Sequence, residues 1–298
     1  MTRSFTSAAT LEEAVAALSA GARAVAGGTD LVVGARQGKA PLPDAIVAID
    51  RIDDLRSLSD EGGGLHLGAL TTHESIASSE VVRSRFTALA DASAIVGSHA
   101  TRAHGTIGGN VMNASPAMET GGPLLCFDAT VTLRGPAGER SLPIGELWTG
   151  PGATIAAPDE LLVAVDLPAP LPDGGSAYVR LEYRRQMEIA VVGATAVVTF
   201  VGATIEDARI AITALAPTIR RVGEAERALV GTEGDGGAIA AAAAATADGA
   251  APIGDVRASA EYRTAMAEVV ARRAIAAAIA RARATEVPIP ASDASYGT

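Results

Sequence analysis

Two glycine-rich runs constrain this chain more than any other feature of its sequence. The richer run is Gly105 to Pro116 (GTIGGNVMNASP), and Val25 to Leu31 (VAGGTDL) carries similar residues about eighty positions earlier. Glycine adopts positive φ and has no Cβ, so paired glycines beside a hydroxyl let bare backbone N–H groups approach an anion. Two such turns could hold two parts of one long phosphate-containing ligand.

In the first run, Gly27-Gly28-Thr29-Asp30 lies between an expected strand and an expected helix. Its amides and the Thr29 hydroxyl could contact a pyrophosphate at the start of that helix. The alternative is a tight turn in which Asp30 caps the helix, and the run taken alone favours this alternative. The run lacks the G-x-G-x-x-G spacing of dinucleotide-binding sites, and Gly34 to Lys39 is one residue short of a P-loop.

The second run is surrounded by polar side chains suited to phosphate and hydroxyl groups. These are Thr106, Asn110, Asn113, Ser115 and Glu119. A solvated surface loop is the alternative, but its apolar residues Ile107, Val111 and Met112 would be badly placed in a mobile loop. We therefore expect an ordered ligand-binding loop.

The charge of the chain excludes one class of partner. The formal net charge is −10 and the isoelectric point is about 4.9, whereas a nucleic-acid partner usually needs a basic face. The first residues include Glu12 and Glu13 and contain no long apolar segment, so we expect no signal peptide. No run is long and apolar enough to span a membrane, and we expect a cytoplasmic protein.

The chain also lacks the residues of several kinds of reactive site. Cys126 is its only cysteine, so any iron–sulfur cluster must be on another chain. The four histidines have no metal-binding spacing, although His99 and His104 lie beside the second run. No serine lies in a G-x-S-x-G motif. The sequence therefore predicts neither a metal site nor a catalytic side chain.

Hydrophobic periodicity predicts both strands and helices. We expect helices over 10–20, 31–37, 73 into the 80s, and 85–96, and largely helical structure over 222–283. We expect strands over 22–26, 45–50, 65–68, 129–134, 161–167, 176–182, 191–200 and 208–215. The 129–134 strand forms a hairpin with Ser141 and Leu142, and 168–175 is a linker. Strands followed by a block of helices indicate an α+β fold.

Three segments together resemble the FAD-binding medium subunit of the molybdenum hydroxylases, the family of xanthine dehydrogenase and carbon monoxide dehydrogenase. They are Ala26 to Asp30, Arg102 with Gly105 to Pro116, and Arg184-Arg185 followed by Glu188-Ile189-Ala190. The resemblance implies a two-subdomain FAD-binding region of the p-cresol methylhydroxylase type, plus a C-terminal domain with a small antiparallel sheet and helices. The implied boundaries are 1–54, 55–170 and 176–285, with a frayed tail over 286–298.

The resemblance also implies which residues bind FAD. They are Val25, Ala26, Gly27, Gly28, Thr29, Asp30, Leu31, Thr106, Gly108, Gly109, Asn110, Glu119, Leu162, Arg180 and Ile189. Glu119 stands where the family usually has Asp, and Arg180 where it has Lys. Carbon monoxide dehydrogenases usually read GGHS where this chain reads Gly27-Gly28-Thr29-Asp30, which favours a xanthine, heterocycle or aldehyde dehydrogenase.

In such a complex the chain is an electron-transfer oxidoreductase subunit. A large molybdopterin subunit oxidises the substrate, a small subunit carries two [2Fe–2S] clusters, and the complex is a dimer of heterotrimers. Electrons pass through FAD to an external acceptor. The alternative is a stand-alone FAD-dependent oxidase or reductase of the p-cresol methylhydroxylase type. A third possibility is a binding protein of this fold that has lost FAD.

Overall fold

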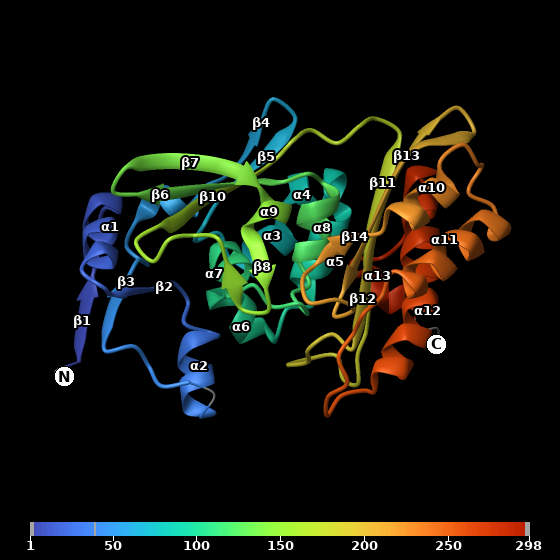
Figure 1. Ribbon diagram of the computed structural model, residues 1–298. Coiled ribbons are helices and arrows are strands. Elements are labelled where there is room, and N and C mark those ends of the chain that lie inside the picture. Colours follow the sequence, from blue (N-terminus) through green and yellow to red (C-terminus); the bar gives the residue numbers. More distant parts are fainter. Residues whose placement is uncertain (1–2, 39, 296–298) are drawn as a thin grey trace.

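The structure, a computed structural model, describes residues 3–38 and 40–295. Figure 1 shows three parts side by side: a small N-terminal sheet with helices, a central group of helices under a larger sheet, and a C-terminal sheet covered by helices. Parallel and antiparallel sheets lie in separate parts of the chain, so the predicted α+β class is confirmed. None of the described helices is long and apolar enough to cross a membrane.

The N-terminal part is a three-stranded parallel sheet in the order β1-β3-β2. Its elements are β1 (Ser4–Ser7), α1 (Leu11–Ser19), β2 (Arg23–Val25), α2 (Leu31–Arg36) and β3 (Ala45–Ala48). The predicted β-α-β unit is confirmed, and β1 is an addition to it. Helix α1 begins where the sequence predicts, because Thr10 Oγ1 accepts a hydrogen bond from Glu13 N at 3.2 Å.

The central part contains a five-stranded antiparallel sheet in the order β4-β5-β10-β6-β7. Its strands are β4 (Leu58–Glu61), β5 (Gly64–Gly68), β6 (Thr130–Gly135), β7 (Gly138–Pro143) and β10 (Leu161–Leu167), with β8 (Trp148–Gly150) and β9 (Ala153–Thr154) forming a separate pair. The predicted hairpin is confirmed, with Thr132 opposite Ser141 and Val131 opposite Leu142.

Several short helices pack beneath this sheet (Figure 1). They are α3 (His73–Ser78), α4 (Glu80–Arg85), α5 (Thr87–Ala94), α6 (His99–His104), α7 (Ile107–Asn113), α8 (Gly121–Cys126) and α9 (Ile144–Leu147). A short 3-10 helix, η1 (Asp53–Arg56), precedes β4 and packs in the N-terminal core through Leu55. The helix expected from His73 into the 80s is interrupted at Ser79. Thr72 caps α3 as predicted, with Thr72 Oγ1 3.1 Å from Ser75 N.

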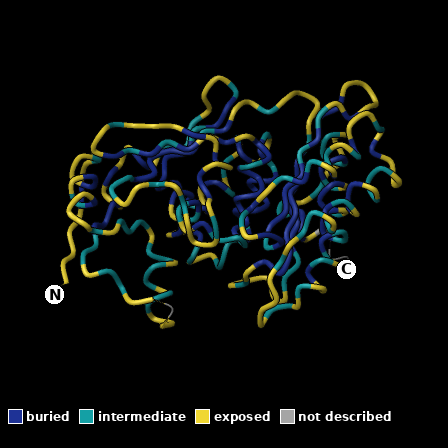
Figure 2. Tube along the Cα trace, in the orientation of Figure 1, coloured by how far each residue is buried: buried dark blue, intermediate teal, exposed yellow. Residues whose placement is uncertain are grey.

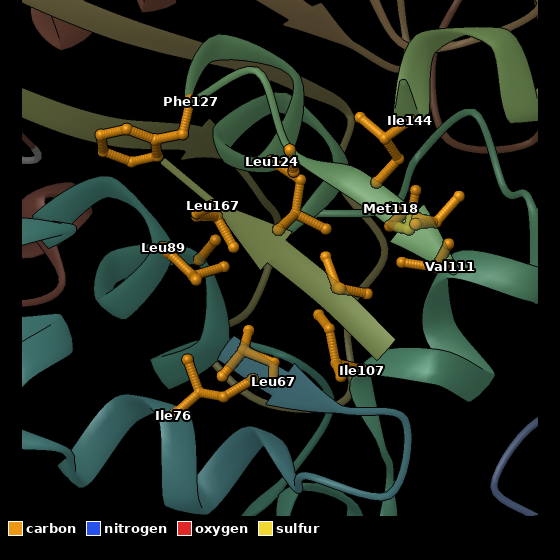
Figure 3. Close-up of a cluster of buried hydrophobic side chains, with 14 of the residues drawn as sticks. Leu67, Ile76, Leu89, Ile107, Val111, Met118, Leu124, Phe127, Ile144 and Leu167 are labelled. Carbon is orange, nitrogen blue, oxygen red and sulfur yellow. The ribbon is translucent and has the colours of Figure 1, made fainter. Parts of the chain in front are cut away.

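The segment expected as a loop over Gly105 to Pro116 contains helix α7 instead. Two glycines inside a helix each cost about 1 kcal/mol relative to alanine. Ile107 and Val111 lie one turn apart and are completely buried among the side chains shown in Figure 3. Burial of two such side chains stabilises the helix by several kcal/mol, roughly 1.5–3 kcal/mol each, and so outweighs the cost of the glycines.

The C-terminal part is an antiparallel sheet in the order β11-β12-β13-β14. Its elements are β11 (Gly174–Leu181), β12 (Val192–Val201), β13 (Thr204–Thr213), β14 (Arg220–Arg221), α10 (Gly223–Leu229), α11 (Gly236–Asp248), α12 (Ala260–Ala282) and α13 (Ala291–Ser295). The sheet is sandwiched: α5 and α8 pack on one face and α12 on the other. The buried alanines of α11 and α12 allow this close packing.

The prediction of a frayed tail is wrong for the described residues 286–295. Ala291 and Ser292 are buried, and Ser292 Oγ accepts a hydrogen bond from Arg180 N at 3.1 Å. Asp91 of α5 is also buried, and it accepts hydrogen bonds from Ala291 N, Tyr178 N and the Arg281 guanidinium at 2.6–3.0 Å. A single carboxylate therefore ties the central part to β11, α12 and the tail.

Candidate cofactor site

The two glycine turns touch each other in the folded chain. A Cβ at Gly27 would lie 1.8 Å from the carbonyl oxygen of His104, so backbone packs directly on backbone there. A Cβ at Gly105 would lie 3.4 Å from Thr29 Oγ1. The turn between β2 and α2 therefore rests on the junction between α6 and α7, and residues about eighty positions apart form one surface.

The first turn offers unused hydrogen-bond donors. Within the described residues, the amides of Gly27, Gly28 and Thr29 donate no hydrogen bond. Gly28 has a φ of +68°, which turns the chain in a way that favours glycine. Asp30 precedes α2, but its side chain makes no capping hydrogen bond. A run of open amides on a glycine turn is suited to a phosphate group.

The amides of the second turn are already engaged, so the expectation of bare N–H groups is wrong there. Ile107 N donates to Thr71 O and Gly108 N to Ala69 O, both at 2.9 Å. Gly109 N donates to Thr106 Oγ1 at 3.1 Å. The first turn of α7 is thus hydrogen-bonded to the loop that follows β5, and its amides are not available to a ligand.

The two glycines of α7 have different surroundings. A Cβ at Gly108 would lie 2.7 Å from both the Cβ and the carbonyl oxygen of Ala69, so the packing of the fold excludes a side chain there. A Cβ at Gly109 would meet only Thr106 Oγ1, at 3.1 Å, and Gly109 is exposed. The internal packing therefore places little restriction on residue 109, and its open face is available to a ligand.

Asn110 continues this surface with an amide side chain. Its Oδ1 accepts a hydrogen bond from Thr120 Oγ1 at 2.6 Å, which fixes the orientation of the side chain. Its Nδ2 donates no hydrogen bond to any described residue. Asn110 therefore presents an oriented donor beside the open face of Gly109.

A buried histidine lies under the contact between the two turns. His73 N donates to Gly105 O at 3.1 Å, and His73 is 2% exposed. Burial, followed by repulsion from Arg102, lowers the pKa of His73 to about 4, so the ring is neutral at pH 7. His104 contributes its carbonyl to the packing of Gly27, and His99 Nδ1 lies 2.9 Å from Arg102 Nη2.

Glu119 and Arg180 were both predicted as flavin contacts, and in the structure they pair with each other. Arg180 Nη1 lies 2.6 Å from Glu119 Oε1, and a second carboxylate, Glu182, also bonds the guanidinium. Arg180 is completely buried and Glu119 is 7% exposed. Burial raises the pKa of Glu119 despite the neighbouring cation.

The other predicted site residues lie in different surroundings. Leu162 of β10 is 2% exposed, and its side chain packs in the central hydrophobic core. Ile189 is 40% exposed and lies in the loop between β11 and β12. That loop reaches α6: Thr101 Oγ1 of α6 donates to Met187 Sδ at 3.5 Å, and Met187 N donates to Gly97 O, just before α6, at 2.8 Å. Figure 2 shows that this loop and α2 are mostly at the surface.

The structure thus brings Gly27 and Thr29 against His104 and Gly105, directly before Thr106 to Asn110, while Leu162 is separated from the surface by its burial. The sequence did not predict the contacts made by Ala69, His73, His104 and Glu182. Three of these, Ala69, His73 and His104, act through backbone atoms, for which residue type carries no signal. The described residues contain no group of three His, Cys, Asp or Glu side chains that could hold a metal ion.

Family models match both halves of the chain. Residues 1–170 match the FAD binding domain in molybdopterin dehydrogenase, and residues 177–278 match the CO dehydrogenase flavoprotein C-terminal domain. The carbon monoxide dehydrogenase medium chain of Hydrogenophaga pseudoflava is 34% identical over 80% of this chain and 83% of its own length. The 6-hydroxypseudooxynicotine dehydrogenase complex subunit alpha of Paenarthrobacter nicotinovorans is 33% identical over 89% of each chain.

Solved structures agree with these sequence matches. A chain of the Hydrogenophaga pseudoflava carbon monoxide dehydrogenase superposes with a TM-score of 0.90 at 32% identity, covering 94% of this chain and 98% of that chain. A chain of quinoline 2-oxidoreductase from Pseudomonas putida superposes with a TM-score of 0.88 at 27% identity, covering 95% and 98%. The chain belongs to the family of FAD-binding medium subunits of the molybdenum hydroxylases, as its sequence motifs predict.

Proposed function

We propose that this chain is the FAD-binding electron-transfer subunit of a molybdenum hydroxylase complex. It receives electrons from [2Fe–2S] clusters on a small subunit and passes them through FAD to an external acceptor. A heterocycle or an aldehyde is oxidised on a large molybdopterin subunit. The chain itself supplies no acid or base for that oxidation, and its contribution is to bind and orient the cofactor.

One observation carries this proposal: two contacting turns, one with open amides and one with an open glycine face. The amides of Gly27, Gly28 and Thr29 would hold a phosphate of FAD. The bare face of Gly109 would lie against another part of the cofactor, and Asn110 Nδ2 would donate to an oxygen of it. Bound FAD supplies the change between two-electron and one-electron transfer that such a complex needs.

The remaining predicted contacts belong to the same proposal. Val25, Ala26, Asp30 and Leu31 flank the first turn, and Thr106 and Gly108 fix the second. Arg180 and Glu119 adjoin the site as an ion pair, Ile189 lies on the loop that approaches α6, and Leu162 would contribute only through its backbone. We propose domain boundaries at 1–54, 55–170 and 176–285, with residues 286–295 packed on the third domain.

The proposed partners follow from the relatives. Their names describe a medium chain, a subunit of a complex and an FAD-binding subunit, and this chain covers most of their length. We infer a heterotrimer that pairs into a dimer and resides in the cytoplasm. Relatives at 33–34% identity include both a carbon monoxide and a nicotine-derivative enzyme, so the GGTD sequence alone supports the preference for a heterocycle or an aldehyde.

The visible spectrum of the purified chain tests this proposal. We expect flavin absorption near that of oxidised FAD and co-purification with a molybdopterin subunit and an iron–sulfur subunit. A colourless chain that takes up no added FAD would refute the proposal. A yellow chain that oxidises a substrate without partners would identify it instead as a stand-alone oxidase of the p-cresol methylhydroxylase type.

A further inference from the structure

A buried ionic cluster connects the central part to the C-terminal sheet. It consists of three residues. Glu119 lies in the segment between α7 and α8, Arg180 is in β11, and Glu182 directly follows β11. The Arg180 guanidinium bonds both carboxylates, and the Glu119 contact is 2.6 Å. The exposed fractions of the three side chains are 0% for Arg180, 9% for Glu119 and 11% for Glu182.

The charges of this cluster do not balance. Two carboxylates surround one guanidinium, which leaves one negative charge in excess when both are ionised. Among the described residues, the charged groups that act on Glu119 are Arg180 and Glu182, and Tyr178 is the further titratable neighbour. Tyr178 is buried and its pKa lies well above 10, so it stays neutral. A buried excess charge is costly, and binding one proton removes it.

The cluster adjoins the proposed cofactor site through a short chain of contacts. Glu119 is followed by Thr120, whose hydroxyl donates to Asn110 Oδ1 at 2.6 Å. Asn110 follows Gly109, whose open face we assign to the cofactor. Negative charge that appears in the cofactor site would therefore act on Glu119, which is itself buried, and electrostatic effects on a buried group are strong.

We propose that the Glu119–Arg180–Glu182 cluster is a proton-binding site coupled to reduction of the cofactor. When the cofactor receives two electrons, the Glu119 carboxylate takes one proton from solvent and becomes a neutral carboxylic acid. Arg180 and Glu182 then remain as a balanced pair. When the electrons leave, Glu119 returns the proton. This inference rests on the proposed function, because it needs FAD bound beside Asn110.

The test measures protons bound per electron pair in the purified chain loaded with FAD. The midpoint potential of bound FAD is followed by spectroelectrochemistry from pH 5 to 9, and the slope against pH counts the protons. We expect the wild type to take up one more proton than Glu119→Gln, which lacks the acceptor. Glu182→Gln should also lose that proton, because it removes the excess charge while keeping Glu119.

Infrared difference spectra provide a readout that does not depend on turnover. Reduction of the wild type should produce a carboxylic-acid C=O band, and Glu119→Gln should lack it. The control is Glu160→Gln, since Glu160 is also shielded and paired with an arginine, Arg140 at 2.6 Å, but belongs to another part of the surface. Glu160→Gln should retain both the band and the extra proton.

The outcomes separate this inference from the proposed function. If the chain binds no FAD, the proposed function fails. If FAD binds and is reduced but the wild type and Glu119→Gln show equal slopes and no band, the proton-binding site is refuted and the cofactor assignment stands. Loss of the band in Glu160→Gln would refute the assignment of that band to Glu119.

Discussion

The two glycine turns look alike in sequence and do different work in the structure. The turn at Gly27-Gly28 leaves its amides open, whereas the turn at Gly108-Gly109 uses its amides to fasten α7 to the loop after β5. The first turn therefore has hydrogen-bond donors available to a ligand, whereas the second has an open glycine face and no available amide. The comparison shows that a Gly-Gly pair does not by itself indicate free N–H groups; the partners of each amide decide.

The four glycines are not needed for the same reason. Gly27 and Gly108 allow close approach of backbone or alanine, and Gly28 adopts a positive φ. Gly109 is the member of the four for which the fold demands least. The substitutions below test these differences. Each changes one property: packing, the space for a ligand, a charge or a helix cap.

The largest effect is expected for Gly27→Ala. The new Cβ would overlap the His104 carbonyl oxygen, so the two turns must move apart. We expect a loss of about 4 kcal/mol in the free energy of unfolding, at the upper end for single substitutions, together with loss of FAD binding. Urea denaturation measures the first and flavin absorbance the second. Unchanged stability would show that the turns do not need this contact.

Gly109→Val should weaken FAD binding at least about a thousandfold, equivalent to about 4 kcal/mol, while the chain still folds. The branched side chain would occupy the proposed cofactor space, and inside the protein its Cβ meets only Thr106 Oγ1, at 3.1 Å. Titration with FAD followed by fluorescence quenching measures the affinity. Gly108→Val is the matched control, and it should lower the free energy of unfolding because Ala69 leaves no room for a side chain. Normal flavin content in Gly109→Val would place the cofactor elsewhere.

Protonation of His73, which lies under the second turn, should lower the free energy of unfolding at acid pH. Its pKa is about 4 in the folded chain and 6.5 ordinarily, so the unfolded chain binds the proton first as pH falls. Stability is therefore lost between pH 6.5 and 4, by about 3 kcal/mol in total at 1.36 kcal/mol per unit. The difference in denaturation midpoint between pH 7 and pH 4.5 should shrink in His73→Gln. An equal pH dependence in both proteins would contradict this role.

The smallest effect is expected for Thr106→Val, which removes the cap of α7 but keeps the side-chain shape. The loss should be about 1 kcal/mol, typical of a helix cap, with a modest decrease in FAD affinity because Gly109 is held less firmly. Thr72→Val removes the equivalent cap of α3. It should cost similar stability and leave FAD affinity unchanged. A greater loss of affinity in the Thr72 variant would contradict the role of α7.

Local signals in the sequence predicted much of the fold. Thr10 and Thr72 cap helices at the predicted positions, and the Gly-Pro turn after Arg134 fixes the register of its hairpin. Strand β1 was missed because Ser4–Ser7 has no alternating apolar pattern, and its structure depends on pairing with β3. Helix α7 was missed because its two glycines disfavour a helix locally. The helix is stabilised by burial of Ile107 and Val111 in the tertiary core, which the local sequence does not indicate.

The motifs predicted which segments form the site, but they did not predict the hydrogen bonds and ion pairs within it. Nothing local indicates that the amides of Ile107 and Gly108 are used by Thr71 and Ala69, since these bonds depend on how β5 and α7 meet. Glu182 also carries no local signal, because an acidic residue two positions after Arg180 is as consistent with an exposed pair as with a buried cluster. Long-range packing decides both.

The carboxylate of Asp91 has a consequence for chain continuity. Asp91 lies in α5 and accepts hydrogen bonds from Tyr178 N, Ala291 N and the Arg281 guanidinium. Along the chain, these three donors all follow the largely exposed segment 168–173, whereas Asp91 precedes it. A protease that severs that segment would leave two polypeptides still clasped by buried hydrogen bonds. The C-terminal portion is thus secured to the rest of the subunit by more than the peptide bonds that join them.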